Sequence, residues 1–124
     1  MLMIVMTTLA GGDLSAAFVG TETLPECRER LERVRLIIND GAAKGGPRIA
    51  GSGCFTSAER FSDFSHGQSN DEPIQHYRIV LSGENAAVIR HDGAEACRRA
   101  IAAAPAAGEQ HCAQSRQTLR ENAR

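Results

Sequence analysis

Ala16-Ala17-Phe18-Val19, with Cys27-Arg28 a few residues later, is the stretch that decides the fold, because the chain repeats it. Seventy positions further on stand Ala86-Ala87-Val88-Ile89 and then Cys97-Arg98. A stretch that recurs at a fixed period is the signature of a structural unit that is used twice. The sequence therefore predicts two related halves, each with its first cysteine at the same place.

Each half also has a second cysteine, and the repeat selects one pairing among the three that four cysteines allow. If each half is cross-linked to itself, the disulfides are Cys27–Cys54 and Cys97–Cys112. A zinc site would need ligand pairs about two to four residues apart, whereas the gaps between successive cysteines are 27, 43 and 15 residues. Free buried thiols are the remaining alternative. Disulfides persist in oxidising compartments, so this pairing predicts a periplasmic or secreted protein of the bacterial envelope.

The first half reads as a β-hairpin followed by a helix. The apolar run Leu2 to Leu9 predicts one strand, and Ser15 to Thr21 predicts the returning strand. Thr23 and Glu26 have the spacing of a capping box that opens a helix, which we expect to end near Ile38. Residues at spacings of three and four form the apolar stripe of this helix, namely Leu24, Cys27, Leu31, Val34 and Ile38.

The remaining segments complete the first half and repeat it at shorter length. Arg48 to Phe64 is predicted to be extended, and residues 65–73 to be a polar surface loop. The second half then has the same order, with strands at Ile74–Leu81 and Ala86–Arg90, a helix capped by Asp92 that ends near Ala104, and a strand around Cys112.

These elements predict a single α+β domain over residues 1–124. We expect two β-hairpin–helix–strand units, at about 2–64 and 74–116, to form one antiparallel or mixed sheet with both helices on one face. The polar tail 117–124 is expected to fray. Leu, Ile, Val and Phe together number only 25 of the 124 residues, so a core this small is expected to depend on its disulfides.

Charge and hydropathy exclude two classes of partner. The formal net charge of −1 gives no surplus of basic side chains to neutralise a polyanion, so no nucleic-acid partner is expected. The apolar run Met1 to Ala10 is far shorter than the roughly 18 residues of a membrane span, so we expect no spanning segment. This run also lacks the basic residues of a signal peptide. We expect it to be a strand, with any export signal lying ahead of Met1.

Candidate binding residues concentrate where the first half has residues that the second half lacks. These candidates are Phe61, Asp63, Phe64 and His66. A loop on a rigid scaffold carries function more often than a core does, which makes His66 the strongest histidine candidate; an ordinary solvated loop is the alternative interpretation. Ser52, in Gly51-Ser52-Gly53, lacks the first glycine of a hydrolase nucleophile turn.

No catalytic residue, metal site or cofactor is therefore predicted, and the expected protein is not an enzyme. The leading hypothesis is an exported accessory or interaction protein that binds a protein partner, an envelope complex or a second copy of itself. A less favoured hypothesis is a small hydrolase that would use His66 with a nearby carboxylate.

A second hypothesis comes from a resemblance. From Ala16 to Ile101 the chain presents a strand–helix–strand unit twice, which is similar in architecture to the peptidoglycan-binding SPOR domains. This resemblance implies a module that binds an envelope glycan or a small ligand. The additional hairpin strand in each half departs from the pattern of that family.

Overall fold

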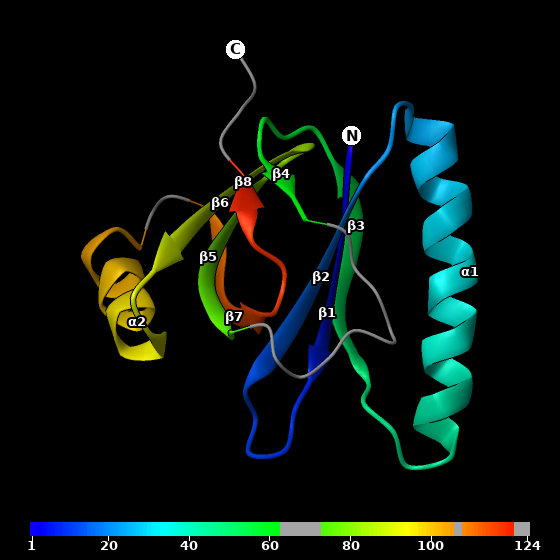
Figure 1. Cartoon of the computed structure of the whole chain (residues 1–124), viewed down its shortest axis with the longest axis horizontal. Coiled ribbons are helices and arrows are strands. Elements are labelled where there is room, and N and C mark those ends of the chain that lie inside the picture. The colour runs from blue at the N-terminus through cyan, green and yellow to red at the C-terminus, as the bar shows by residue number, and fades with distance from the viewer. Residues whose placement is uncertain (63–72, 106–107, 121–124) are drawn as a thin grey trace.

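The computed structural model describes residues 1–62, 73–105 and 108–120. Two helices and eight strands follow one another in these residues (Figure 1). In chain order they are β1 (Leu2–Thr8), β2 (Leu14–Gly20), α1 (Leu24–Ala43), β3 (Ile49–Phe55), β4 (Arg60–Phe61), β5 (Gln75–Ser82), β6 (Asn85–His91), α2 (Ala94–Ala103), β7 (Glu109–Ser115) and β8 (Leu119–Arg120).

Six of the strands form one mixed sheet in the order β3-β1-β2-β7-β5-β6. In each half the third strand pairs antiparallel with the first strand of the hairpin, so β3 lies beside β1 and β7 lies beside β5. The halves meet where β2 runs parallel to β7. The predicted α+β fold with a mixed sheet is thus confirmed, and both halves have the same strand order.

The sheet curls until its two outer strands touch. At the centre, Ser15 of β2 pairs with Gln114 of β7. At the edges, Thr56 directly after β3 forms a parallel bridge with Asn85 of β6, and the Thr56 N–H donates to the Glu84 carbonyl at 2.8 Å. The two junctions correspond to each other. Thr56 lies two residues after Cys54, and Gln114 lies two residues after Cys112. Each of them pairs near the start of the second hairpin strand of the other half. The topology is therefore symmetric, while descent of the halves from one repeated sequence stays a prediction.

Both helices cover the same face of the sheet, as predicted. Side chains alternate between the faces of a strand, and Cys54 and Cys112 point toward the helices. The disulfides Cys27–Cys54 and Cys97–Cys112 are present, with Cα–Cα distances of 6.1 and 6.0 Å, which confirms the predicted pairing. Each bridge holds the first turns of a helix against the third strand of its half.

The larger core lies on the opposite face. Tyr77 and Phe18 are fully buried there, and Phe61 from β4 stacks on Phe18 with 4.0 Å between ring centroids. A two-stranded ribbon, β4 with β8, provides this cover through the Arg60–Arg120 and Phe61–Leu119 pairs. Sequence analysis did not predict this ribbon. The buried residues of the core cluster are Leu2, Ile4, Met6, Ala16, Phe18, Tyr77, Ile79, Ala86, Val88 and Ala113.

The prediction of a frayed tail from residue 117 was wrong, because Gln117 is 3% exposed and anchors the end of the chain. Its side-chain amide pairs with the free edge of β2: the Phe18 N–H donates to Oε1 at 2.8 Å, and Nε2 donates to the Phe18 carbonyl at 2.7 Å. Nε2 also donates to the Ser62 carbonyl at 2.8 Å. The Tyr77 hydroxyl donates to the Gln117 carbonyl at 2.7 Å. Residues 121–124 lie outside the described part of the chain.

Two helix boundaries differ from those predicted. α1 does not end near Ile38 but continues to Ala43, because its stop is Gly45, whose φ of 93° favours glycine. The Gly45 and Gly46 N–H groups cap the last turn by donating to the Ala42 and Gly41 carbonyls. α2 is capped by Gly93 and not by Asp92, and no side chain caps it. The Thr23 cap of α1 is confirmed, with the Glu26 N–H donating to its hydroxyl.

The described part of the segment predicted to be extended from Arg48 to Phe64 contains two strands, β3 and β4. β3 continues through Gly51 and Gly53 without interruption. A Cβ on Gly53 would lie 2.7 Å from the ring of Phe55, so this glycine leaves room for that ring inside the curled sheet. After Phe55 the chain turns, and β4 crosses the core as half of the ribbon.

We expect Gln117→Ala to lower the free energy of unfolding by about 3 kcal/mol, because it leaves buried backbone groups of Phe18 and Ser62 without partners. Urea unfolding followed by circular dichroism measures this loss. Gln114→Ala is the matched control, with an expected change within about 0.5 kcal/mol. Equal losses in the two variants would contradict the anchoring role of Gln117.

Candidate functional site

The residues singled out from the sequence are not brought together into a site by the described part of the chain. Phe61 belongs to the aromatic core, where it stacks on Phe18 and meets the Tyr77 ring edge-on at 5.5 Å. Packing therefore accounts for its position. Asp63, Phe64 and His66 lie outside the described residues.

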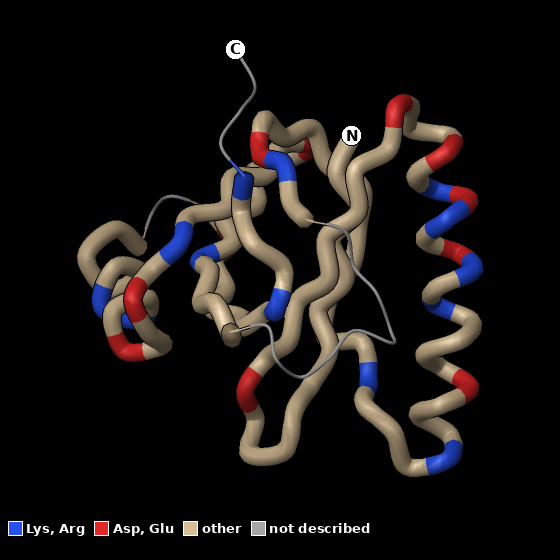
Figure 2. Tube along the Cα trace, viewed as in Figure 1, with Lys and Arg blue, Asp and Glu red and all other residues tan. Residues whose placement is uncertain are grey.

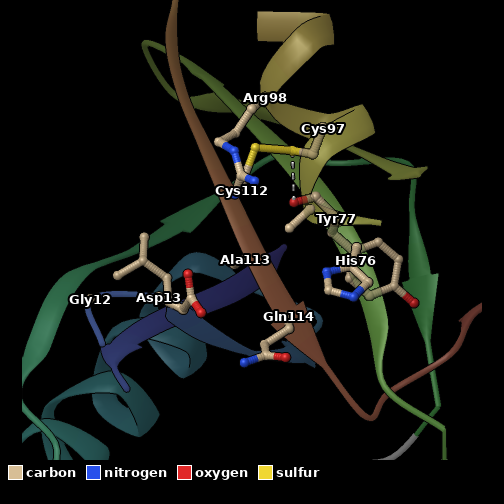
Figure 3. A pocket seen from close by; sticks show the side chains of 11 residues that line it. Gly12, Asp13, His76, Tyr77, Cys97, Arg98, Cys112, Ala113 and Gln114 are labelled. Carbon is tan, nitrogen blue, oxygen red and sulfur yellow. Dashed lines mark hydrogen bonds between the residues drawn. A yellow bond between two sulfur atoms is a disulfide. The ribbon is translucent and has the colours of Figure 1, made fainter. Parts of the chain in front are cut away.

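A different group of polar residues surrounds a cavity of about 240 Å³ on the helix-covered face. The cavity lies between α2, β5, β7 and the turn before β2 (Figure 3). Its polar side chains are Asp13 from the turn, His76 from β5, Arg98 from α2 and Gln114 from β7. The second disulfide also lines it.

Strand register positions the residues on the sheet side of this cavity. Gln114 lies opposite His76 across the β5–β7 pair, and His76 lies opposite His91 across the β5–β6 pair. On the other side, Gln114 meets Ser15 of β2 at the junction of the halves. Residues directly opposite in neighbouring strands point to the same face. A polar row therefore crosses four strands at the end of the sheet where α2 begins.

The helix side of the cavity is set by the disulfide. Cys97 is fully buried and its Sγ lies 3.7 Å from the Tyr77 carbonyl oxygen; this is a contact only, because a disulfide sulfur carries no proton. Arg98 is the next residue along α2, and Figure 3 shows its side chain turned toward Cys112. The disulfide thus holds the arginine at the cavity.

The four polar side chains of the cavity have no hydrogen-bond or ion-pair partner among the described residues, unlike their neighbours. Arg78, on the same face, donates to His91 Nε2 at 3.2 Å and to Gln110 Oε1 at 3.1 Å. Arg99, beside Arg98 on α2, pairs with Glu95 at 3.4 Å. Arg98 and Gln114 are therefore available to donate to a ligand, and Asp13 to accept from one.

The corresponding place in the first half is apolar. Cys27 is fully buried in a cluster with Met3 and Val5, and Cys54 packs against the same cluster. Leu31, Val34 and Ile38 of α1 complete this cluster. Each helix has its cysteine as its one buried residue, but the shorter, alanine-rich α2 places no side chain in either core cluster of the described residues. The two halves thus share a disulfide position and differ in what surrounds it.

A second cavity, of about 390 Å³, lies at the edge where the curled sheet closes. Met6, Phe55 and Leu81 line it together with Gly51 and the rim residue Glu109. Glu109 is already paired with His111, at 2.9 Å. This cavity opens toward the main core and offers fewer free polar groups than the one beside α2.

Within the part of the chain that the structure describes, no three His, Cys, Asp or Glu side chains are grouped as metal ligands. No helix in these residues has the length and apolar character needed to cross a membrane. The comparisons add no relative: no family model, no curated protein and no solved structure matches this chain.

This cavity was not predicted from the sequence. The cavity residues come from four elements, and no two of them are joined by a sequence motif. The available signal was indirect: Arg98 follows the repeated cysteine, and the second half is short and rich in alanine. A half that has lost large side chains leaves space beside its disulfide.

Tyr77 provides a test of the core behind the cavity. Burial raises the pKa of its hydroxyl above 10.0, and this effect is opposed by the hydrogen bond from the Leu119 N–H and by the charge of Arg90. Because the pKa is raised in the folded state, folding favours the neutral form of the Tyr77 hydroxyl. The contribution of this hydroxyl to stability is therefore complete below pH 10. It is lost as the pH rises through the folded-state pKa.

We therefore expect the protein to lose stability above pH 10 by up to about 1.4 kcal/mol for each unit by which the pKa is raised, and Tyr77→Phe to lose this dependence. Tyrosinate absorbance measures the titration directly, because the chain has one Tyr and no Trp. A midpoint at or below 10.0 would contradict the burial argument.

Proposed function

We propose that the protein is an exported, non-catalytic interaction protein that binds a protein partner through the outer side of α1. Its two disulfides are compatible with an oxidising compartment, the periplasm or the exterior. The observation that carries the proposal is the exposure of two large apolar side chains on α1, Leu36 at 61% and Ile37 at 71%. Apolar side chains grouped on a surface are typical of interaction sites.

The charges around this pair indicate the partner's chemistry. Four arginines and two glutamates lie between residues 28 and 35 of α1, in the roughly two turns directly before Leu36 (Figure 2). One arginine of the four, Arg33, pairs with Glu29 at 3.5 Å. Over the whole of α1 the four arginines are balanced by Glu26, Glu29, Glu32 and Asp40. The apolar pair with charges of both signs around it fits a protein surface with an apolar socket and a rim of mixed charge.

A double variant tests this proposal. Leu36→Ser with Ile37→Ser should weaken partner binding about 10- to 100-fold while leaving the fold intact, because truncating an interface anchor costs about 1–3 kcal/mol. The measurement is quantitative affinity capture from an envelope extract, followed by titration of the purified partner. Ile74→Ser, at another exposed apolar residue, is the matched control.

Three results decide the proposal. A partner retained by the wild type and by Ile74→Ser, but lost by the double variant, supports it. Equal retention by all three proteins would overturn it. Self-association that the double variant abolishes, seen by light scattering, would replace the partner with a second copy of this chain.

The unpaired polar groups beside α2 favour a second candidate function, the binding of an envelope glycan or small polar ligand. Arg98 and Gln114 would donate to a carboxylate or hydroxyl, and Asp13 would accept. Isolated cell-wall sacculi are the probe: we expect retention of the wild type and of Arg99→Ala, and loss of retention with Arg98→Ala. Equal retention of both variants would contradict a role for the cavity.

A further inference from the structure

The two disulfides have matching positions in the fold and opposite surroundings. Each begins at the fourth residue after a helix N-cap, Cys27 after Thr23 and Cys97 after Gly93. Both of these cysteines are 0% exposed, and each is bonded to a half-buried cysteine of the third strand. Helix position and burial therefore cannot make the two bridges differ in reactivity, and any difference must come from their neighbours.

The neighbours of the first bridge oppose its opening. Cys27 and Cys54 belong to the apolar cluster of Met3, Val5 and the inner stripe of α1. Thiol–disulfide exchange expels a thiolate. A thiolate formed in this cluster would lose its hydration with no cation to replace it, and such surroundings raise the pKa of a thiol.

The neighbours of the second bridge favour its opening. Cys97 and Cys112 line the cavity of about 240 Å³ together with Arg98 and His76 (Figure 3). Arg98 has no ion-pair partner among the described residues, and cationic neighbours lower the pKa of a cysteine thiol. The cavity admits a small molecule to the bridge, and the free guanidinium attracts one that carries a carboxylate.

We propose that Cys97–Cys112 is a site of reversible exchange with low-molecular-weight thiols that carry a carboxylate, and that Cys27–Cys54 is a purely structural bridge. The thiol first loses its proton to solvent. Its sulfur then attacks Cys112 Sγ and forms a new S–S bond there, while the Cys97–Cys112 bond breaks and its electron pair remains on Cys97 Sγ as a thiolate. The incoming thiol is oxidised to a mixed disulfide, Cys97 is reduced, and its thiolate later takes up a proton.

Two observations place the attack on Cys112. Cys112 is partly exposed, whereas Cys97 is fully buried. Cys97 is also the better leaving group, because it lies in the first turns of α2, where the helix dipole stabilises negative charge, and Arg98 follows it.

Exchange would release one helix without dissolving the sheet. Each helix has its cysteine as its one buried residue, but among the described residues no side chain of α2 belongs to either core cluster, so this bridge is the main side-chain attachment of α2. The strands β5, β6 and β7 stay joined by their own pairing. The mixed disulfide therefore detaches α2 from β7 and exposes the polar row beneath it.

The test is a time course of native protein with reduced glutathione, stopped by alkylation and mapped by peptide mass spectrometry. We expect glutathione on Cys112 and alkylated Cys97 to appear about tenfold faster than any product at Cys27 or Cys54. The difference in rate is expected because the leaving Cys97 thiol has the lower pKa and because the cavity gives the incoming thiol access to Cys112. The first bridge is an internal control within the same chain.

A charge variant separates attraction by Arg98 from simple loosening of the helix. Arg98→Gln should slow the reaction with 2-mercaptoethanol, which has no carboxylate, because the leaving thiolate of Cys97 loses a nearby cation. It should slow the reaction with glutathione about fivefold more, the size of one nearby charge interaction in water. Arg99→Gln should change neither rate. Opening of both bridges at equal rates, an adduct on Cys97, or an equal effect of Arg98→Gln on both thiols would overturn the proposal.

Discussion

The side-chain amide of Gln117 is the interaction on which the rest of the fold depends. β2 pairs along its length with β1, but with β7 only at Ser15, so its edge at Phe18 needs another partner. The Gln117 amide replaces a strand there, and its contact with Ser62 holds the β4–β8 ribbon over the core. Buried backbone groups without partners are costly, so the two halves, the ribbon and the aromatic core are stabilised by one residue.

The symmetry of the halves makes their differences informative. The same strand order, junction register and disulfide position recur in both, while the residues around each disulfide do not. α1 covers its bridge with Leu31, Val34 and Ile38 and turns Leu36 and Ile37 outward. α2 is short and leaves its bridge beside a polar cavity. One half is suited to binding a protein surface, and the other to admitting a small molecule.

Much of this fold was predictable from local patterns. The helix stripe of α1, the hairpins and the disulfide pairing follow from spacings of two, three, four and seventy residues in the sequence. The ribbon was not predictable, because β4 and β8 are two residues long and exist only through pairing with each other. In the sequence Gln117 resembles a residue of a polar tail, because none of the residues around it indicates a contact with Phe18.

The sequence by itself determined the order of the two helices and of the six strands of the main sheet, and which cysteines pair, because these depend on periodicity and on a repeated unit. Only the tertiary structure decided where the halves meet, what covers the second face of the sheet and which polar residues surround the second disulfide. Those outcomes depend on strand register and on the second disulfide, which together bring Asp13, His76, Arg98 and Gln114 to one cavity from four elements. Residues so far apart in the chain become neighbours through hydrogen bonding between strands, which no local pattern encodes.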